Sequence, residues 1–358
     1  MGMAPLIKTD FGGAPRIESV QPDVALPGGE VEIHGANLGP VTAPASGTSV
    51  SWRRPVAMLG ELAAPVVMSR SRRLVLRVPD EAESGKLRIL QNGAQSNQVD
   101  LSVASLVATG IHAVASPAVD EAGNIYVTLS GSRGQETPVS VYRVEQDGEM
   151  RPFLSGIMNA TGLAMGPDGY LYVSSRNDGT VYRVTHSGAA SVYAEGMGVA
   201  TGMAFDGEGN LYVGDRSGTI FKIAPDRQIF VFSTLEPSVA AYHLAFGIDG
   251  TLYVAGPTTS SHDAVYAIDQ DGATTVFYRG LGRPQGLAVD VAGAVYVAGS
   301  LGGRRGVVRI GPGEEDPALV ISGSGIVGFT FVPGGSALVA TGSSVYHVPL
   351  GVEGWRIF

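Results

Sequence analysis

The C-terminal two thirds of the chain repeats a short pattern of apolar and polar positions. A turn containing glycine leads into an apolar residue, a tyrosine and a valine, as in the segment Gly-Tyr-Leu-Tyr-Val at 169–173. Copies of this pattern recur every 40–46 residues. The tyrosine position is filled by Tyr126, Tyr172, Tyr212, Tyr253, Tyr296 and, in a degraded copy, Leu338.

Each copy predicts four short strands. In the second copy we expect them at 162–165, 171–173, 181–184 and 191–193, with Asp-Gly or Gly-Asn turns of the hairpin type between strands. Glycine and proline recur too often for helices. Because a repeat of about 40–45 residues is the span of one four-stranded blade, six copies predict a six-bladed β-propeller over residues 104–358.

The two ends of the repeat region predict how the ring closes. The last copy has a third strand at 345–348 but no clear fourth strand after it. A spare strand, 105–109, precedes the first inner strand. Pairing this spare strand with the last blade would remove two open sheet edges, so we expect it to be the outer strand of blade 6.

Residues 16–103 lie outside the repeat and predict a separate domain. Several short strands surround the strings Pro-Gly-Gly at 27–29 and Gly-Ala-Asn-Leu-Gly at 35–39. This region resembles the IPT/TIG family of immunoglobulin-like domains, which implies a β-sandwich. Residues 104–358 resemble NHL-repeat and gluconolactonase-type propellers. We therefore expect an all-β chain with a leader segment at 1–15 and two domains joined near Val103 without a long linker.

Composition narrows the partners and the compartment. The formal net charge is −9, whereas a nucleic-acid partner would require a basic surface. There is no cysteine, which excludes a disulfide framework or a thiolate nucleophile. No apolar run approaches the roughly 20 residues of a membrane span, and residues 1–13 lack a signal-peptide pattern. The chain reads as cytoplasmic, or as secreted or periplasmic if a native leader was removed.

Several arginines are predicted near one mouth of the channel. Arg176 and Arg216 hold the same repeat position, four residues after the tyrosine, so they would reach neighbouring blades at one level. Guanidinium groups bind carboxylate or phosphate in a bidentate fork, which favours a small anionic ligand. Alternatively, these arginines are solvated or pair with Asp178 and Asp215.

His243 stands out at the start of the fourth inner strand. Most other copies place glycine there, so an imidazole at this level could enter the channel as a ligand contact, a general base or a metal donor. The alternative is a histidine that fills space between blades. The full set of candidate ligand-binding residues at this mouth is Arg133, Asn159, Thr161, Arg176, Thr201, Asp215, Arg216, Tyr242, His243, Gln285 and Arg304.

The resemblance to gluconolactonases implies a divalent metal held by carboxylate and Asn ligands, but this chain departs from that set. Ser116 lies in the stretch where the family has Glu, Thr161 and Thr201 stand where it has Asn, and Gln285 stands where it has Asp. No nucleophile-elbow, phosphate-loop or zinc-protease string occurs either.

These observations leave three classes of function open. The first is a binding or interaction protein, with a small anionic molecule or a protein partner at the propeller mouth and the IPT/TIG module as a positioning arm. The second is a propeller hydrolase or lyase that uses His243, with or without a metal. The third is a structural scaffold. Metal analysis of the purified protein separates the second class from the others.

Overall fold

The regular elements of the protein are all β-strands, as predicted. The computed structural model describes residues 13–43, 51–132, 134–313 and 316–357. By its contacts the chain divides into two compact units, Met1–Val103 and Ala104–Phe358. Within the described residues no helix is long and apolar enough to cross a bilayer.

The N-terminal unit is a sandwich of two sheets. The first sheet is antiparallel, in the order β1 (Arg16–Gln21), β3 (Glu30–Ala36), β9 (Arg73–Arg77), β8 (Val66–Arg70). The second runs β2 (Val24–Ala25), β12 (Val99–Val103), β10 (Gly85–Gln91), β6 (Val56–Leu59), β7 (Leu62–Ala64), with β2 and β12 parallel and β11 (Ala94–Gln95) also on β10. A short pair, β4 (Val41–Ala43) and β5 (Ser51–Arg53), completes the unit.

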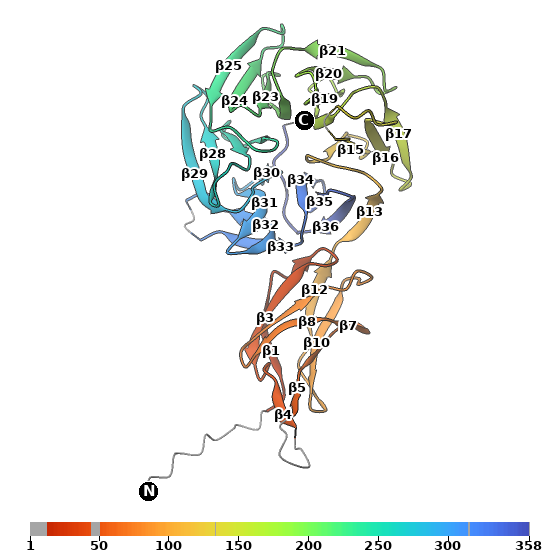
Figure 1. Ribbon diagram of the computed structural model, residues 1–358, viewed down its shortest axis with the longest axis vertical. Helices are drawn as coiled ribbons and strands as arrows, with labels where there is room; N and C mark the ends of the chain where they lie inside the picture. The colour runs from red at the N-terminus through yellow and green to blue at the C-terminus, as the bar shows by residue number, and fades with distance from the viewer. Residues whose placement is uncertain (1–12, 44–50, 133, 314–315, 358) are drawn as a thin grey trace. The chain divides into compact units, whose positions relative to one another are not determined.

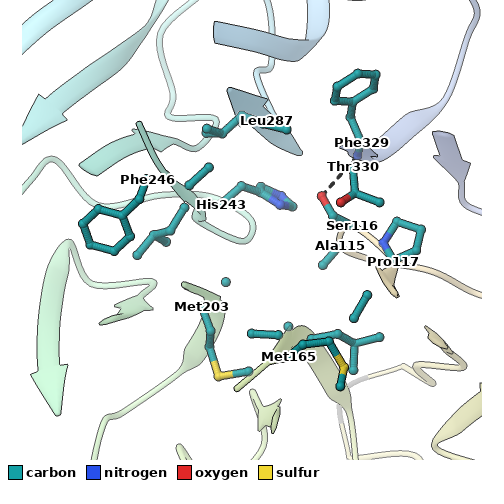
Figure 2. Close-up of a pocket in the computed structure, with 18 of the residues that line it drawn as sticks. Ala115, Ser116, Pro117, Met165, Met203, His243, Phe246, Leu287, Phe329 and Thr330 are labelled. Atoms are coloured by element: carbon teal, nitrogen blue, oxygen red, sulfur yellow. Dashed lines mark hydrogen bonds between the residues drawn. The ribbon is translucent and has the colours of Figure 1, made fainter. Parts of the chain in front are cut away.

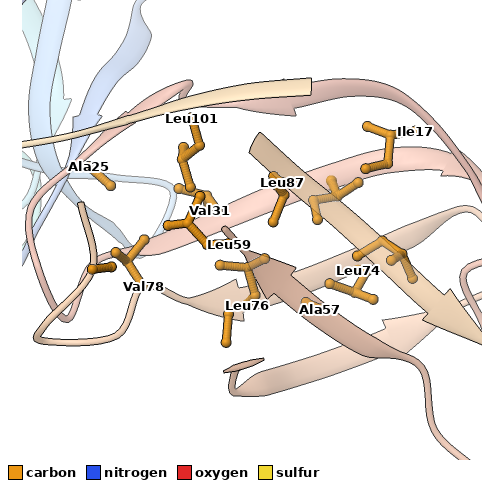
Figure 3. Packing of buried hydrophobic residues seen from close by; sticks show 14 of the residues in the cluster. Ile17, Ala25, Val31, Ala57, Leu59, Leu74, Leu76, Val78, Leu87 and Leu101 are labelled. Carbon is orange, nitrogen blue, oxygen red and sulfur yellow. The ribbon is translucent and has the colours of Figure 1, made fainter. Parts of the chain in front are cut away.

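Alternating side chains from both sheets form one apolar core (Figure 3). Val31 and Ile33 of β3 are fully buried, and they meet Leu87 and Ile89 of β10 in the same cluster. Period-two burial of this kind is what packs two strand faces together. Each such side chain contributes about 1.5–3 kcal/mol by leaving water.

The C-terminal unit is a ring of six four-stranded antiparallel sheets around a central channel (Figure 1). Blades 1 to 3 are β14 (Ala118–Val119), β15 (Ile125–Thr128), β16 (Val141–Val144), β17 (Met150–Leu154); β18 (Ala160–Met165), β19 (Leu171–Ser175), β20 (Val181–Val184), β21 (Ala190–Ala194); and β22 (Ala200–Phe205), β23 (Leu211–Asp215), β24 (Thr219–Ile223), β25 (Ile229–Thr234).

Blades 4 to 6 continue the ring, with each inner strand named first. They are β26 (His243–Phe246), β27 (Leu252–Ala255), β28 (Asp263–Ile268), β29 (Thr274–Leu281); β30 (Leu287–Val289), β31 (Val295–Leu301), β32 (Arg304–Ile310), β33 (Ala318–Ser322); and β34 (Ile326–Val332), β35 (Ser336–Thr341), β36 (Ser344–Pro349), β13 (Ser105–Thr109).

The predicted ring closure is confirmed. Strand β13 lies antiparallel to β36, with Ser105 opposite His347 and Thr109 opposite Ser344. The first strand of the unit is therefore the outer strand of its last blade. This pairing covers the edge of β36, which would otherwise offer unpaired backbone groups to solvent.

The recurring tyrosine has a structural role that explains its conservation of place within the repeat. In blades 1 to 3 its ring is buried in the blade, and its hydroxyl donates to an aspartate in the turn between the first two strands. Burial, assisted by Asp120, raises the pKa of Tyr126 to about 12, so the hydroxyl stays a donor. The hydrogen bonds run from Tyr126 to Asp120 at 3.0 Å, from Tyr172 to Asp168 at 3.0 Å and from Tyr212 to Asp206 at 3.2 Å.

Candidate functional site

The six inner strands approach one another closely where they begin, at the end of the channel that we call the mouth. A Cβ atom on Gly162 would lie 2.2 Å from the carbonyl oxygen of Thr201 on the next blade. Glycine holds this position in four of the six blades because backbone occupies the space a side chain would need. Blades 1 and 4 instead carry Ser116 and His243 there.

A cavity of about 210 Å³ lies in the channel below this level (Figure 2). All six blades line it, together with residues 355–357. Polar and apolar groups share its walls about equally, and its polar side chains are those of Ser116, His243, Thr330, Trp355 and Arg356. A concave site that combines apolar walls with a few convergent polar groups is the usual form of a small-molecule site.

His243 points into this cavity from the mouth side of β26 (Figure 2). Its side chain is buried, and the imidazole makes no hydrogen bond with any residue that the structure describes. Burial lowers its pKa from 6.5 to about 4, because a charged ring is poorly solvated there. At neutral pH the imidazole is therefore uncharged and offers one donor and one acceptor.

The neighbouring hydroxyl on the mouth side has a partner within the protein. Ser116 Oγ accepts a hydrogen bond from the backbone N–H of Phe329 at 3.1 Å, the dashed line of Figure 2. This bond ties blade 1 to blade 6. The hydroxyl proton of Ser116 takes no part in this bond.

The other end of the cavity is closed by residues 350–357, which we call the crossing segment. It leaves blade 6 after β36 and passes beneath the ends of the inner strands. Glu353 O accepts from Val291 N at 3.1 Å, and Trp355 N donates to Val289 O at 2.8 Å. Figure 1 shows the last described residues lying in the middle of the ring.

The crossing segment brings two polar side chains to the cavity. The indole N–H of Trp355 is buried and has no hydrogen-bond partner among the described residues. An unpaired buried donor of this kind costs about 1–3 kcal/mol. Arg356 makes a single long contact, from a guanidinium nitrogen to Val119 O at 3.5 Å, and no ion pair within the described part of the chain.

Three candidates of the predicted polar ring are used inside the scaffold. Thr201 Oγ1 donates to Gly214 O at 2.8 Å and accepts from Tyr242 N at 3.1 Å. Asn159, at φ 51°, makes hydrogen bonds of 2.9 Å with the backbone of Gly131, Ser132 and Gly134. Thr161 Oγ1 donates to Asn159 O at 2.9 Å. None of the three lines the cavity, because each side chain turns to backbone groups of its own or a neighbouring blade.

Tyr242 and Asp215 are likewise structural in their contacts. The Tyr242 hydroxyl donates to Glu236 O, its Cβ packs over Gly214 of blade 3, and its ring packs over Gly256 of blade 4. Asp215 accepts from Val199 N at 2.8 Å and from the hydroxyl of Ser217. Tyr242 thus stabilises the junction of blades 3 and 4, and Asp215 stabilises the entry into blade 3.

The predicted arginines do not meet in this cavity. Arg176 is half-buried, and one of its guanidinium nitrogens donates to Gly131 O at 2.8 Å. Arg216 is exposed. Neither lines the cavity that His243 faces. Each arginine directly follows the second strand of its blade, β19 or β23, whereas the blades line the cavity with their inner strands. The expectation of a shared cavity with His243 is therefore corrected for the site described here.

The remaining candidates are dispersed. Gln285 and Arg304 are half-buried and do not line the cavity. Arg133 lies outside the described residues. Of the ten sequence-predicted candidates that the structure describes, His243 alone lines the cavity.

Sequence reasoning missed Trp355 and Arg356. They follow the last repeat copy, so no equivalent position in another blade marks them. A signal was present in retrospect, since a Trp-Arg pair stands in a segment that the repeat does not require. Its meaning depends on where the segment crosses.

The residues present do not fit a divalent-metal site of the gluconolactonase type. Such a site needs several oxygen ligands converging on one point. Nowhere in the described ranges do three His, Asp or Glu side chains group closely enough to hold a metal ion. His243 has no carboxylate beside it in the cavity wall.

Comparison with known proteins finds no matching family model and no curated protein of similar sequence. Solved structures do resemble it. A gluconolactonase from Xanthomonas campestris is 17% identical, with a TM-score of 0.55 over 68% of this chain and 88% of that chain. An auxiliary nutrient binding protein from Bacteroides thetaiotaomicron is 11% identical, with a TM-score of 0.52 over 94% and 98%.

A third similar structure is a catalytically inactive variant of virginiamycin B lyase from Staphylococcus aureus, bound to quinupristin. It is 12% identical, with a TM-score of 0.52 over 90% of this chain and 99% of that chain. At these identities the likeness shows a shared propeller fold. Because one fold hosts binding proteins, lactonases and lyases, function has to be argued from the site.

Proposed function

We propose that this protein is a non-catalytic binding protein whose propeller channel takes up a small molecule with an anionic group. The N-terminal unit, which resembles an IPT/TIG domain, would serve as a positioning module. The observation that carries the proposal is the imidazole of His243, which has no partner among the described residues and faces a cavity of about 210 Å³ lined by both polar and apolar groups.

The geometry favours binding over hydrolysis or elimination. A general base works best when its pKa lies near the working pH, and the pKa of His243 is held at about 4. A catalytic histidine is also usually oriented by a third group. No carboxylate lines this cavity, so His243 is better suited to offer a hydrogen bond than to move a proton.

Two solved structures with this fold are auxiliary nutrient binding proteins, from Bacteroides thetaiotaomicron and Bacteroides ovatus. Their names describe those proteins, and they support small-molecule binding as a role that the fold can serve. The lactonase and lyase structures keep an enzymatic alternative in view, and the site itself must discriminate between them.

The test is a thermal-shift screen of the full chain against small organic acids, phosphates and their neutral analogues. A ligand that binds only the folded state raises the melting temperature by mass action. We expect a concentration-dependent rise with at least one acid, weakened in His243→Gln, and recovery of the ligand unchanged after incubation. No shift with any compound would contradict binding, whereas conversion of the ligand would favour the enzyme.

A further inference from the structure

We propose that the guanidinium of Arg356 forms the acid-recognition end of the channel. The ligand would then be a small monocarboxylate with an apolar body. This inference rests on the proposed binding function and deepens it by assigning the ligand class.

The charge of the cavity wall supports a single negative group. Arg356 is the one cation in the lining, and no carboxylate side chain accompanies it. Its only described contact is long, at 3.5 Å to Val119 O. A guanidinium has five N–H donors in a planar fork that matches the two oxygens of a carboxylate.

Trp355 lies beside Arg356 in the same part of the lining. Its indole nitrogen exposes almost no surface, so this donor does not face the cavity. Trp355 therefore contributes wall next to the guanidinium, and recognition of the acid falls to Arg356.

The side chains between the two ends of the cavity determine which kind of ligand body can fit. Met165, Met203, Phe246 and Leu287 surround the space in Figure 2. A phosphate dianion would leave oxygens against these apolar groups without partners, which is unfavourable. The volume of about 210 Å³ lies below the range of drug-sized pockets, so the acid should carry only a short hydrocarbon chain.

His243 sits at the opposite end, nearer the mouth. Its neutral imidazole can exchange a hydrogen bond with a second polar group on the ligand, such as a hydroxyl or a carbonyl. The two ends therefore have different chemistry. One is cationic and the other is a neutral donor and acceptor.

The crossing segment offers a way to disturb this end of the cavity without touching its polar groups. A Cβ on Gly354 would lie 2.1 Å from Cβ of Phe331, so Gly354→Ala should displace the segment. Gly207 has no atom within 4 Å of an added Cβ. Gly207→Ala is therefore the matched control.

Trp355 also provides the readout. The chain has two tryptophans, and Trp52→Phe leaves Trp355 as the sole reporter. In this background, the full chain is titrated with hexanoate and with its neutral analogue hexanamide while indole fluorescence is followed. We expect a saturable change with hexanoate and at least tenfold weaker binding of hexanamide.

Two variants then locate the recognition. Arg356→Gln should weaken hexanoate at least tenfold and leave hexanamide nearly unchanged, so the preference for the acid disappears. Gly354→Ala should weaken both probes, while Gly207→Ala should weaken neither. A third probe, 6-hydroxyhexanoate, reports on the other end of the channel: His243→Gln should weaken its binding, because its terminal hydroxyl can exchange a hydrogen bond with the imidazole.

The outcomes separate the two proposals. Equal affinity for hexanoate and hexanamide, unchanged by Arg356→Gln, would overturn the acid-recognition end while leaving channel binding intact. The acid-recognition end would also be overturned if neither Arg356→Gln nor Gly354→Ala changed the affinity for hexanoate. If acids of four to eight carbons and their amides all leave fluorescence and melting temperature unchanged in a folded protein, the proposed binding function itself fails.

Discussion

The protonation of His243 links its burial in the channel to the pH dependence of the protein's stability. In an unfolded chain its pKa would be near 6.5, and in the folded protein burial holds it at about 4. Between these values the unfolded state binds a proton that the folded state does not. Stability is therefore lost as the pH falls from about 6.5 to about 4.

The size of that loss gives a prediction. At 1.36 kcal/mol per pKa unit, the gap between 6.5 and about 4 corresponds to about 3 kcal/mol. We expect denaturant unfolding of His243→Gln to lose less free energy between pH 7 and pH 4 than the natural chain does. The exposed His186→Gln variant is the control and should keep the full dependence. Parallel curves for all three proteins would contradict burial of a neutral imidazole.

Thr161 and Thr201 occupy equivalent positions in neighbouring blades, but we expect their replacement by valine to lower the stability by unequal amounts. Thr201→Val leaves Gly214 O and Tyr242 N without their hydroxyl partner, at a cost of about 1–3 kcal/mol. Thr161→Val removes one local bond to Asn159 O and should cost less. Urea denaturation of the two variants measures the difference, and equal losses would argue against the interblade role of Thr201.

The inner strands show how an element is shaped by its neighbours. Their first residues pack backbone against backbone around the channel, as Gly162 does against Thr201. This is a close-approach requirement, which alternation along a single strand cannot reveal. The same close approach explains why only blades 1 and 4 carry a side chain at this position.

A prediction at this scale compares a glycine of an inner strand, Gly162, with a glycine in a turn of blade 3, Gly207. Gly162→Ala places a Cβ 2.2 Å from Thr201 O, so the strand must shift, and we expect a loss of about 1–3 kcal/mol from overpacking. Gly207→Ala meets nothing within 4 Å and should be neutral. Thermal unfolding compares the two, and a stable Gly162→Ala variant would mean that the inner strands are more widely spaced.

At the scale of the whole molecule, closure of the ring depends on a strand that precedes the propeller repeats. Strand β13 ends at Thr109 and pairs with β36 more than two hundred residues later. The long-range pairing joins the two ends of one compact unit. The unit Ala104–Phe358 therefore contains every strand of its six blades.

This organisation predicts different fates for two truncations. Residues 104–358 expressed alone should unfold cooperatively, because all six blades remain complete. Residues 110–358 lack β13 and leave the edge of β36 unpaired, so they should melt lower and self-associate. Calorimetry and size-exclusion chromatography distinguish them. Equal stability of the two fragments would mean that β13 adds little to the ring.

Much of the fold could be predicted from the sequence because it is repetitive. The 40–46-residue spacing set the number of blades, and the orphan strand at 105–109 predicted the closure. The mouth candidates were chosen on the same logic of equal repeat positions. That logic places residues at one level but does not identify their partners, so it predicts Thr201 and Asn159 as ligand contacts although their side chains already bond to backbone atoms.

What the sequence determined by itself is thus periodic: strand alternation, turn chemistry and the tyrosine of each blade are local signals that repeat. What only the tertiary structure decided is the composition of the channel. Its wall combines two side chains from the glycine-favouring level, those of Ser116 and His243, with Trp355 and Arg356 from a segment outside the repeat. The physical reason is that a cavity is bounded by whichever chain segments cross it, and the path of the crossing segment is decided by contacts with blades 5 and 6 rather than by any pattern within it.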